Sequence, residues 1–304
     1  MDVVVGLGLH RPMTRAELAP LSPWSPSQHD PDDCIATDWV DGIPGAVGRP
    51  VAEADVVVSV GIAELHQYAG VSGGHKGVAV GCGGRETLAA LHHRDRVLSP
   101  GVRIGKVDGN PFRAVVDALG CAARCTLALV YAPAARVWLA GEPCTVIREA
   151  ATRIAPWIPE PRLWSGAVLR VPRAKASSLY QASRAATYLG LSPAPPLASG
   201  ARLVLDAACP EGLGSEAGFV AALRAHAPPW SGLLTGAPPA GAGAQRAVML
   251  ALLARDFRLE LAGVDDPSPF RAVGISATRA PAPTGPDWLD VPSPFTALPQ
   301  RSPA

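Results

Sequence analysis

Lysine is scarce in this 304-residue sequence, which has Lys76, Lys106 and Lys175 beside 24 arginines. The 27 basic residues nearly balance the 26 acidic ones and leave a net charge of +1, so the basic excess of a nucleic-acid-binding protein is missing. No apolar run is long enough to span a bilayer, and the start, MDVVVGLGLH, lacks the basic region and cleavage site of a secretory signal. These absences favour a cytoplasmic protein without nucleic-acid or membrane partners.

Cysteine is also sparse, since six residues in a chain of this length do not make a disulfide scaffold. Cys121 and Cys125 are four positions apart, but no second pair follows at the spacing of a zinc ribbon. We therefore interpret the cysteines as buried thiols in a reducing compartment. Apolar residues make up 48% of the chain, which indicates a globular protein with a substantial core.

Strand-like and helix-like segments alternate along the whole chain, which predicts the α/β class with mostly parallel sheets flanked by helices. A buried strand is expected at 2–8, and further strands are expected at 53–62, 125–133, 167–172, 201–209 and 257–263. The run at 53–62, EADVVVSVGI, is of the continuous apolar type typical of strands buried on both faces. Two helix starts carry capping signals, Thr14 with Glu17 and Asn110 with Pro111.

Two domains are expected, with the active site in the cleft between them. The stretch 156–166, PWIPEPRLWSG, has three prolines and two tryptophans and is interpreted as the connector. The predicted boundaries are 1–155, 156–280 and a Pro-rich, loosely ordered tail at 281–304.

Six of the seven histidines lie in the first 93 residues. His66 precedes the Gly-rich turn that carries Lys76, and His92 follows at the end of an expected helix. Such turns after strands let backbone N–H groups approach an anion. The turn is not a Walker A motif, because Gly77 replaces the Ser or Thr that follows the lysine there.

These residue types suggest specific chemistry. A lysine in such a turn can contact phosphate, act as a base or form a covalent bond. His10 and His66, expected at facing strand ends, could serve opposite faces of one carbon, and His92 could hold nickel. A single histidine is more often structural, and His29, His75 and His93 keep that interpretation.

At these residues the sequence resembles the nickel-dependent lactate racemase family, whose members carry a nickel-pincer nucleotide (pyridinium bis-thiocarboxylate mononucleotide nickel). The resemblance covers nearly the whole chain. Its motifs are GLHRPMT at 8–14, HD at 29–30, ADVVVSVGIAELHQYAGVSGGHK at 54–76, ETLAALHH at 86–93, GNPFR at 109–113, SSLYQASRA at 177–185, CPEGLG at 209–214 and, more weakly, 243–263.

The resemblance implies racemisation or epimerisation of a small 2-hydroxy acid by hydride transfer to the cofactor and back. It implies that Lys76 forms the covalent thioamide link, that His92 completes the nickel coordination, and that His10 and His66 act as acid and base. The further cofactor-binding residues that it implies are Ser72, Gly73, Gly74, Tyr180, Gln181 and Arg184. The partners implied are the small-molecule substrate and the enzymes that synthesise the cofactor.

The sequence departs from the family pattern at three places. Family members have a segment with Thr-Arg-Pro before the His-Arg motif, and this sequence, which begins at the strand before His10, is expected to lack it. Arg184 stands where the family has a lysine, and Val80 where a proline is usual. The departures leave a truncated, inactive or cofactor-binding paralogue as an alternative.

A third alternative is a zinc metallohydrolase that uses His10, His66 and His92. It lacks an HExxH motif or a clustered carboxylate ligand, and it leaves Lys76 unexplained.

Overall fold

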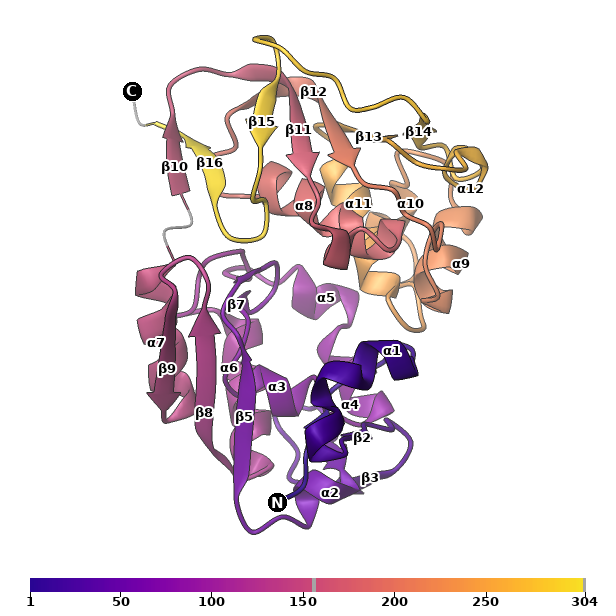
Figure 1. Ribbon diagram of the computed structural model, residues 1–304. Helices are drawn as coiled ribbons and strands as arrows, with labels where there is room; N and C mark the ends of the chain where they lie inside the picture. Colours follow the sequence, from indigo (N-terminus) through magenta and orange to yellow (C-terminus); the bar gives the residue numbers. More distant parts are fainter. Residues whose placement is uncertain (155–156, 303–304) are drawn as a thin grey trace. The chain divides into compact units, whose positions relative to one another are not determined.

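The computed structural model describes residues 1–154 and 157–302, and the chain divides into two compact units, Met1–Ile154 and Ala155–Ala304 (Figure 1). The predicted domain boundary between residues 155 and 156, and the first residue of the predicted connector, lie outside the described residues. No helix in the described part of the chain combines the length and the apolar character that crossing a membrane requires.

A three-stranded sheet with the order β5-β8-β9 forms the centre of the first unit. β5 (Val57–Ile62) runs parallel to β8 (Cys125–Ala132), and β9 (Val137–Gly141) runs antiparallel to β8. Figure 1 shows these three strands side by side, with helices behind them. The helices packed on the sheet are α3 (Lys76–Ala79), α6 (Pro111–Ala122) and α7 (Pro143–Arg153).

Shorter elements complete the first unit. They are β1 (Val4–Val5), α1 (Arg15–Leu18), the 3₁₀ helix η1 (Ala19–Trp24), β2 (Ser27–Gln28), β3 (Cys34–Ala36), β4 (Ala46–Gly48), α2 (Arg49–Ala52), β6 (Leu65–His66), β7 (Gly70–Val71), α4 (Arg85–Leu91) and α5 (Arg94–Val97). β1 pairs in parallel with β2, whereas β3–β4 and β6–β7 are antiparallel pairs. Both capping predictions are confirmed: Thr14 and Glu17 form a capping box at α1, and Asn110 caps α6 with Pro111 in its first turn.

The burial predicted for two strands of the first unit is wrong. Residues 2–8 contain a strand of only two residues, β1, whose side chains are half-buried. β5 starts at Val57, and its side chains alternate between the helices and solvent, so Val57 is 7% exposed and Val60 is 64% exposed. Because helices pack on one face of this sheet, the other face keeps apolar side chains at its surface.

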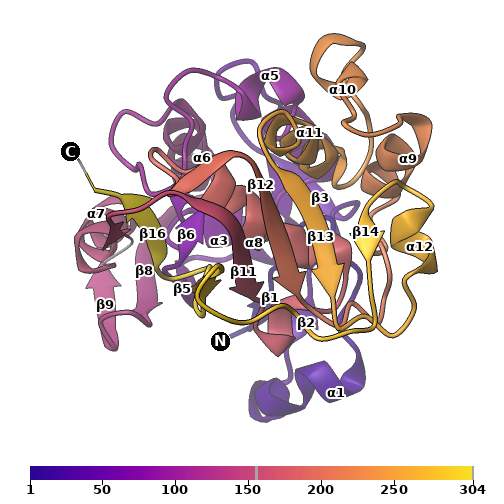
Figure 2. The ribbon, with the colours of Figure 1, turned by 90° about the horizontal axis from the view of Figure 1, so that it is seen from above.

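The second unit contains a five-stranded, fully parallel sheet with the order β14-β13-β12-β11-β15. Its strands are β11 (Trp164–Arg170), β12 (Leu197–Asp206), β13 (Arg258–Ala262), β14 (Ser276–Ala277) and β15 (Leu289–Val291). Its helices are η2 (Arg173–Lys175), α8 (Leu179–Gly190), α9 (Ala217–Ala225), α10 (Gly232–Thr235), α11 (Ala244–Leu253) and α12 (Ser268–Arg271). Figure 2 shows α8 behind β11 and β12. The predicted α/β class with mostly parallel, helix-flanked sheets is confirmed.

Residues 281–302, the described part of the predicted Pro-rich tail at 281–304, contain two strands that pair with other parts of the unit. β15 adds an edge strand to the sheet, and β16 (Leu298–Arg301) pairs with β10 (Trp157–Glu160). Within the tail, Ala282 and Trp288 pack on the face formed by Val168, Val204 and Ala262. Apolar contacts therefore hold a segment whose proline content suggested a loose end. β10 also places part of the predicted connector in the second unit.

Candidate active site

Lys76 stands at the first position of α3, directly after the turn Ser72–His75. Gly73 and Gly74 have φ values of +89° and +61°, a left-handed conformation that favours glycine. A Cβ on Gly74 would lie 2.6 Å from Ile147 and 3.0 Å from the carbonyl oxygen of Pro143. The paired glycines therefore permit both the turn and its close packing on α7.

Side chains from β5 and α6 fix this turn. Arg113, only 2% exposed, lies in the first turns of α6. Its Nη1 donates to the carbonyl of Val71 at 3.1 Å and its Nη2 to that of Gly73 at 3.3 Å. From β5, the hydroxyl of Ser59 donates to the carbonyl of Gly74 at 2.7 Å. The bonds to Gly73 and Gly74 satisfy backbone oxygens in a turn that makes no regular ladder, and the bond to Val71 fixes the end of β7 before that turn.

Sequence reasoning did not assign Arg113 or Ser59 to the site. Two signals were available: Arg113 belongs to the GNPFR motif, and Ser59 interrupts an apolar strand. Neither signal identifies the bonding partner, since Arg113 lies 40 residues beyond Gly73.

His66 and His92 lie on the same aromatic cluster. The ring of Tyr68 is 5.7 Å from that of His66 and 6.0 Å from that of His92, and both contacts are edge-on. Phe112 of α6 contacts Tyr68 and His92 at 5.5 Å and 5.6 Å between ring centroids. Asn110 donates to the carbonyl of Tyr68 at 2.7 Å and so ties the cluster to the start of α6. The structure thus brings together two of the imidazoles that the sequence singles out.

Backbone groups select the tautomers of these two rings. Nδ1 of His66 accepts the N–H groups of Tyr68 and Ala69 at 3.3 and 3.0 Å, so a neutral His66 has its proton on Nε2. Nδ1 of His92 lies 3.0 Å from the carbonyl of Leu88 and must donate to it. A neutral His92 therefore has its lone pair on Nε2, as a metal ligand needs.

His10 lies in an exposed turn, five residues beyond β1 and not at a strand end that faces His66. The chain before it runs along the segment after Lys76, since the N–H of Gly8 donates to the carbonyl of Gly81 at 2.8 Å. Beyond it, Arg11 makes a two-bond ion pair with Glu17 of α1, at 3.0 Å for each bond.

The residues singled out in the second unit lie on α8. Tyr180 is 9% exposed, and its ring contacts Phe219 at 5.3 Å. Burial raises the pKa of its phenol. Gln181 and Arg184 are half-buried, and Arg184 donates to both the side-chain and the backbone oxygen of Gln181. The two polar side chains thus act as a pair, whereas Tyr180 packs in the interior of the unit.

The other histidines of the first unit have structural contacts. His29 is buried and bonds the carbonyl of Gly83 at 3.0 Å, and burial lowers its pKa. His93 caps α5 by accepting from the N–H of Asp95 at 3.4 Å. His75 is also buried, between helices.

Similarity to known sequences lies in the first unit. Residues 1–105 match the family model described as the lactate racemase N-terminal domain. The lactate racemase of Lactiplantibacillus plantarum is 30% identical over 118 residues, which make up 36% of this chain and 28% of that protein. The match therefore spans less than a third of the length of this curated relative.

Similarity to solved structures extends over both units. The lactate racemase apoprotein from Thermoanaerobacterium thermosaccharolyticum aligns with a TM-score of 0.81 at 16% identity, over 98% of this chain and 78% of that chain. A Thermotoga maritima protein aligns with a TM-score of 0.73 at 16% identity, over 98% of this chain and 85% of that chain. At such identity the likeness concerns the fold. The sequence likeness to the lactate racemase N-terminal domain is therefore confined to the first unit, and the likeness of the whole chain to these structures is one of fold.

Proposed function

We propose that this protein is a cytoplasmic racemase or epimerase of a small 2-hydroxy acid that uses a nickel-pincer nucleotide attached to Lys76. The observation that carries the proposal is the pair of imidazoles around Tyr68. Each ring contacts Tyr68 and bonds a backbone group through its Nδ1, and this bond selects the tautomer of the neutral ring. The match of residues 1–105 to the lactate racemase N-terminal domain and the glycine turn before Lys76 support the same assignment.

The residues of the first unit fit this cofactor. Lys76 offers the amine for the thioamide link, and the turn of Ser72, Gly73 and Gly74 precedes it without side-chain bulk at the two glycines. His92 offers an Nε2 lone pair in the tautomer that its bond to Leu88 selects, and imidazole nitrogen suits nickel. When bound, the cofactor supplies hydride acceptance and return at the substrate carbon, a step for which a histidine alone is too weak.

His10 and His66 manage the proton on the substrate oxygen. Oxidation of a 2-hydroxy acid to the keto acid releases a hydride from carbon and a proton from the hydroxyl group, and His10 is our proposed acceptor for that proton. His66 presents N–H at Nε2, which donates a hydrogen bond to the same oxygen. For His66 to accept a proton, its Nδ1 must first release the amides of Tyr68 and Ala69.

The second unit contributes charge to the substrate in this proposal. Arg184 and Gln181 bind the acid in this proposal, with the guanidinium of Arg184 paired to the carboxylate of the substrate. Tyr180 holds α8 from inside the unit and so supports this pair.

The decisive experiment is intact-mass analysis of protein produced together with the cofactor-synthesis enzymes. The wild-type chain is expected to carry an adduct, and the Lys76→Ala chain to lack both the adduct and all racemisation. The scarcity of lysine gives matched controls, because Lys106→Ala and Lys175→Ala remove the only other lysine amines and should keep the adduct.

Three results test the attachment site, the activity and the roles of the two histidines. An adduct that persists in Lys76→Ala would refute the attachment site. An adduct in the wild type without turnover, in a screen of chiral 2-hydroxy acids that begins with lactate, would indicate the inactive paralogue. Retention of the adduct but loss of turnover in His10→Ala and His66→Ala would support their roles.

A further inference from the structure

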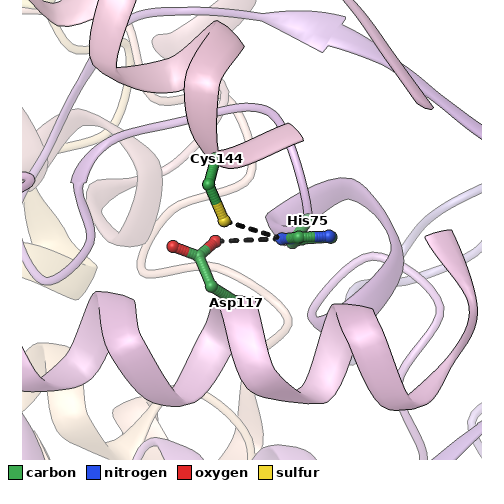
Figure 3. Close-up of side chains that lie close together, drawn as sticks. All are labelled: His75, Asp117 and Cys144. Carbon is green, nitrogen blue, oxygen red and sulfur yellow. Dashed lines mark hydrogen bonds and ion pairs between the residues drawn. The ribbon is translucent and has the colours of Figure 1, made fainter. Parts of the chain in front are cut away.

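His75, Asp117 and Cys144 come from three separate segments and meet beside the turn that carries Lys76 (Figure 3). His75 precedes α3, Asp117 lies on α6, and Cys144 is the second residue of α7. Their possible ligand atoms, one nitrogen, one oxygen and one sulfur, all lie within 4.8 Å of one another. The active-site roles proposed above use none of these three side chains.

The imidazole of His75 directs a lone pair at the other two groups. Its Nε2 lies 3.0 Å from the carbonyl of Cys125, so a neutral ring donates its proton there. Nδ1 then faces Asp117 Oδ1 at 3.2 Å and Cys144 Sγ at 3.6 Å without a proton of its own. A nitrogen lone pair that faces a carboxylate is repelled unless a cation or a proton lies between them. A backbone carbonyl on the far nitrogen is the usual outer partner of a metal-ligating histidine.

The two distances match the edges of a tetrahedral site. With bonds of about 2.0–2.1 Å to nitrogen and oxygen and about 2.3 Å to sulfur, tetrahedral zinc places N and O about 3.4 Å apart and N and S about 3.6 Å apart. The structure has 3.2 Å and 3.6 Å. The distances from His75 Nδ1 to the other two ligand atoms are therefore already close to those of a tetrahedral site.

Close packing and an ion pair surround His75 and Asp117. His75 is 1% exposed and packs on Gly120 of α6, where an added Cβ would lie 2.4 Å from the Cβ of His75. Glycine within a helix costs about 1 kcal/mol relative to alanine, and here it makes room for the imidazole. Nε of the buried Arg113 lies 3.1 Å from the carboxylate of Asp117 and holds its orientation.

The local charge favours a cation at Cys144. Burial raises the pKa of its thiol to about 12, and the carboxylates of Asp117 and Glu142 add to the rise. The negative charges that oppose a bare thiolate attract a positive ion, and a bound ion replaces the thiol proton, which leaves to solvent.

We propose that His75, Asp117 and Cys144 bind one borderline divalent ion of the Zn²⁺ class, with water in the fourth position. The ion joins α6 and α7 to the segment that leads into Lys76, so it stabilises the turn that the covalent cofactor needs. The mixed N, O, S ligand set suits zinc and cobalt rather than magnesium or calcium. This site is separate from the nickel ligand His92 and does not depend on the proposed racemase activity.

Cobalt(II) titration of the cofactor-free full chain tests the proposal, because a cobalt–thiolate bond has a charge-transfer band in the near ultraviolet. The wild-type chain is expected to show this band with one equivalent of Co²⁺, and Zn²⁺ should displace it. Cys144→Ser should abolish the band, and Asp117→Asn should weaken Co²⁺ binding by roughly 10- to 100-fold.

Two matched controls separate this site from its neighbours. Cys121 Sγ lies 3.8 Å from the other ring nitrogen of His75, Nε2, so Cys121→Ser keeps the band if the assignment is correct. His92→Ala should also keep it. A wild-type chain without the band, or a band that survives Cys144→Ser in a folded variant with an unchanged circular dichroism spectrum, would overturn the proposal.

Discussion

Backbone contacts decide what three imidazoles of the first unit can do, those of His66, His75 and His92. The carbonyl of Leu88 makes His92 a lone-pair donor at Nε2, whereas the amides of Tyr68 and Ala69 make His66 a proton donor at Nε2. The carbonyl of Cys125 turns the lone pair of His75 toward a carboxylate and a thiol. Three rings of the same type thus receive three different chemical roles from their neighbours.

His92→Ala tests the first of these roles. In protein that carries the covalent cofactor, loss of this ligand should weaken nickel retention by about 10- to 100-fold or more, because even changes outside the ligand shell cost that much. Elemental analysis after dialysis against a chelator measures the nickel content per chain.

His93→Ala is the matched control for this measurement, since it removes the adjacent imidazole, which caps α5. Full nickel occupancy in His92→Ala would contradict the ligand role. Equal loss in both variants would point to a disturbed α4–α5 junction instead.

At the residue scale, the sequence predicts which side chains are candidates for catalysis or binding. It does not predict which other residues these side chains contact. The scarcity of lysine and the paired glycines drew attention to Lys76 and its turn. The contact of Arg113 with Gly73 and that of His75 with Asp117 join residues 40 and 42 positions apart, so the sequence does not reveal them. Such contacts depend on the tertiary fold.

At the scale of elements, local signals predicted helix starts well and strand burial poorly. A capping box needs only residues within one turn, so Thr14 and Glu17 suffice to predict the start of α1, and the structure has both bonds. The burial of β5 depends on what covers each face of the sheet. Helices pack on one face only, which a run of valines does not reveal.

Glu17 of the capping box also forms an ion pair with Arg11, which connects the His10 segment to α1. The pKa of the Glu17 carboxyl group should therefore report this contact. The hydrogen bonds from Arg11, then those from Thr14, lower the pKa of Glu17 from 4.5 to about 2. A folded-state pKa below the unfolded one means that the interaction is fully present above pH 4.5 and is lost as the pH falls toward 2.

An NMR titration of the Glu17 carboxyl measures this directly. The midpoint should lie at about 2 in the wild type and move toward 4.5 in Arg11→Met. As a control, Arg15→Met removes an exposed arginine at the start of α1 and should leave the titration midpoint of Glu17 unchanged. An ordinary wild-type midpoint, or one that Arg11→Met does not move, would show that Arg11 does not hold this carboxylate in solution.

At the scale of the whole molecule, the residues proposed for one reaction are divided between two units. The alternation of strands and helices predicted the α/β class, and it could do so because each βα unit is a local pattern. The two strands of the Pro-rich tail escaped prediction, since β15 and β16 pair with strands more than 100 residues earlier. Proline content describes local stiffness and not long-range pairing.

Arg184 tests whether the second unit takes part in the reaction that Lys76 serves. If its guanidinium binds the substrate carboxylate, Arg184→Ala should raise KM for the racemised 2-hydroxy acid by roughly 10- to 100-fold. This factor corresponds to the loss of one charged hydrogen bond, which contributes about 1.5–3 kcal/mol. The covalent adduct should remain, because Lys76 is unchanged. Arg255→Ala removes an exposed arginine of the same unit and should change neither quantity. If Arg184→Ala alters neither KM nor cofactor occupancy, α8 lies outside the site, and the first unit must bind the acid without it.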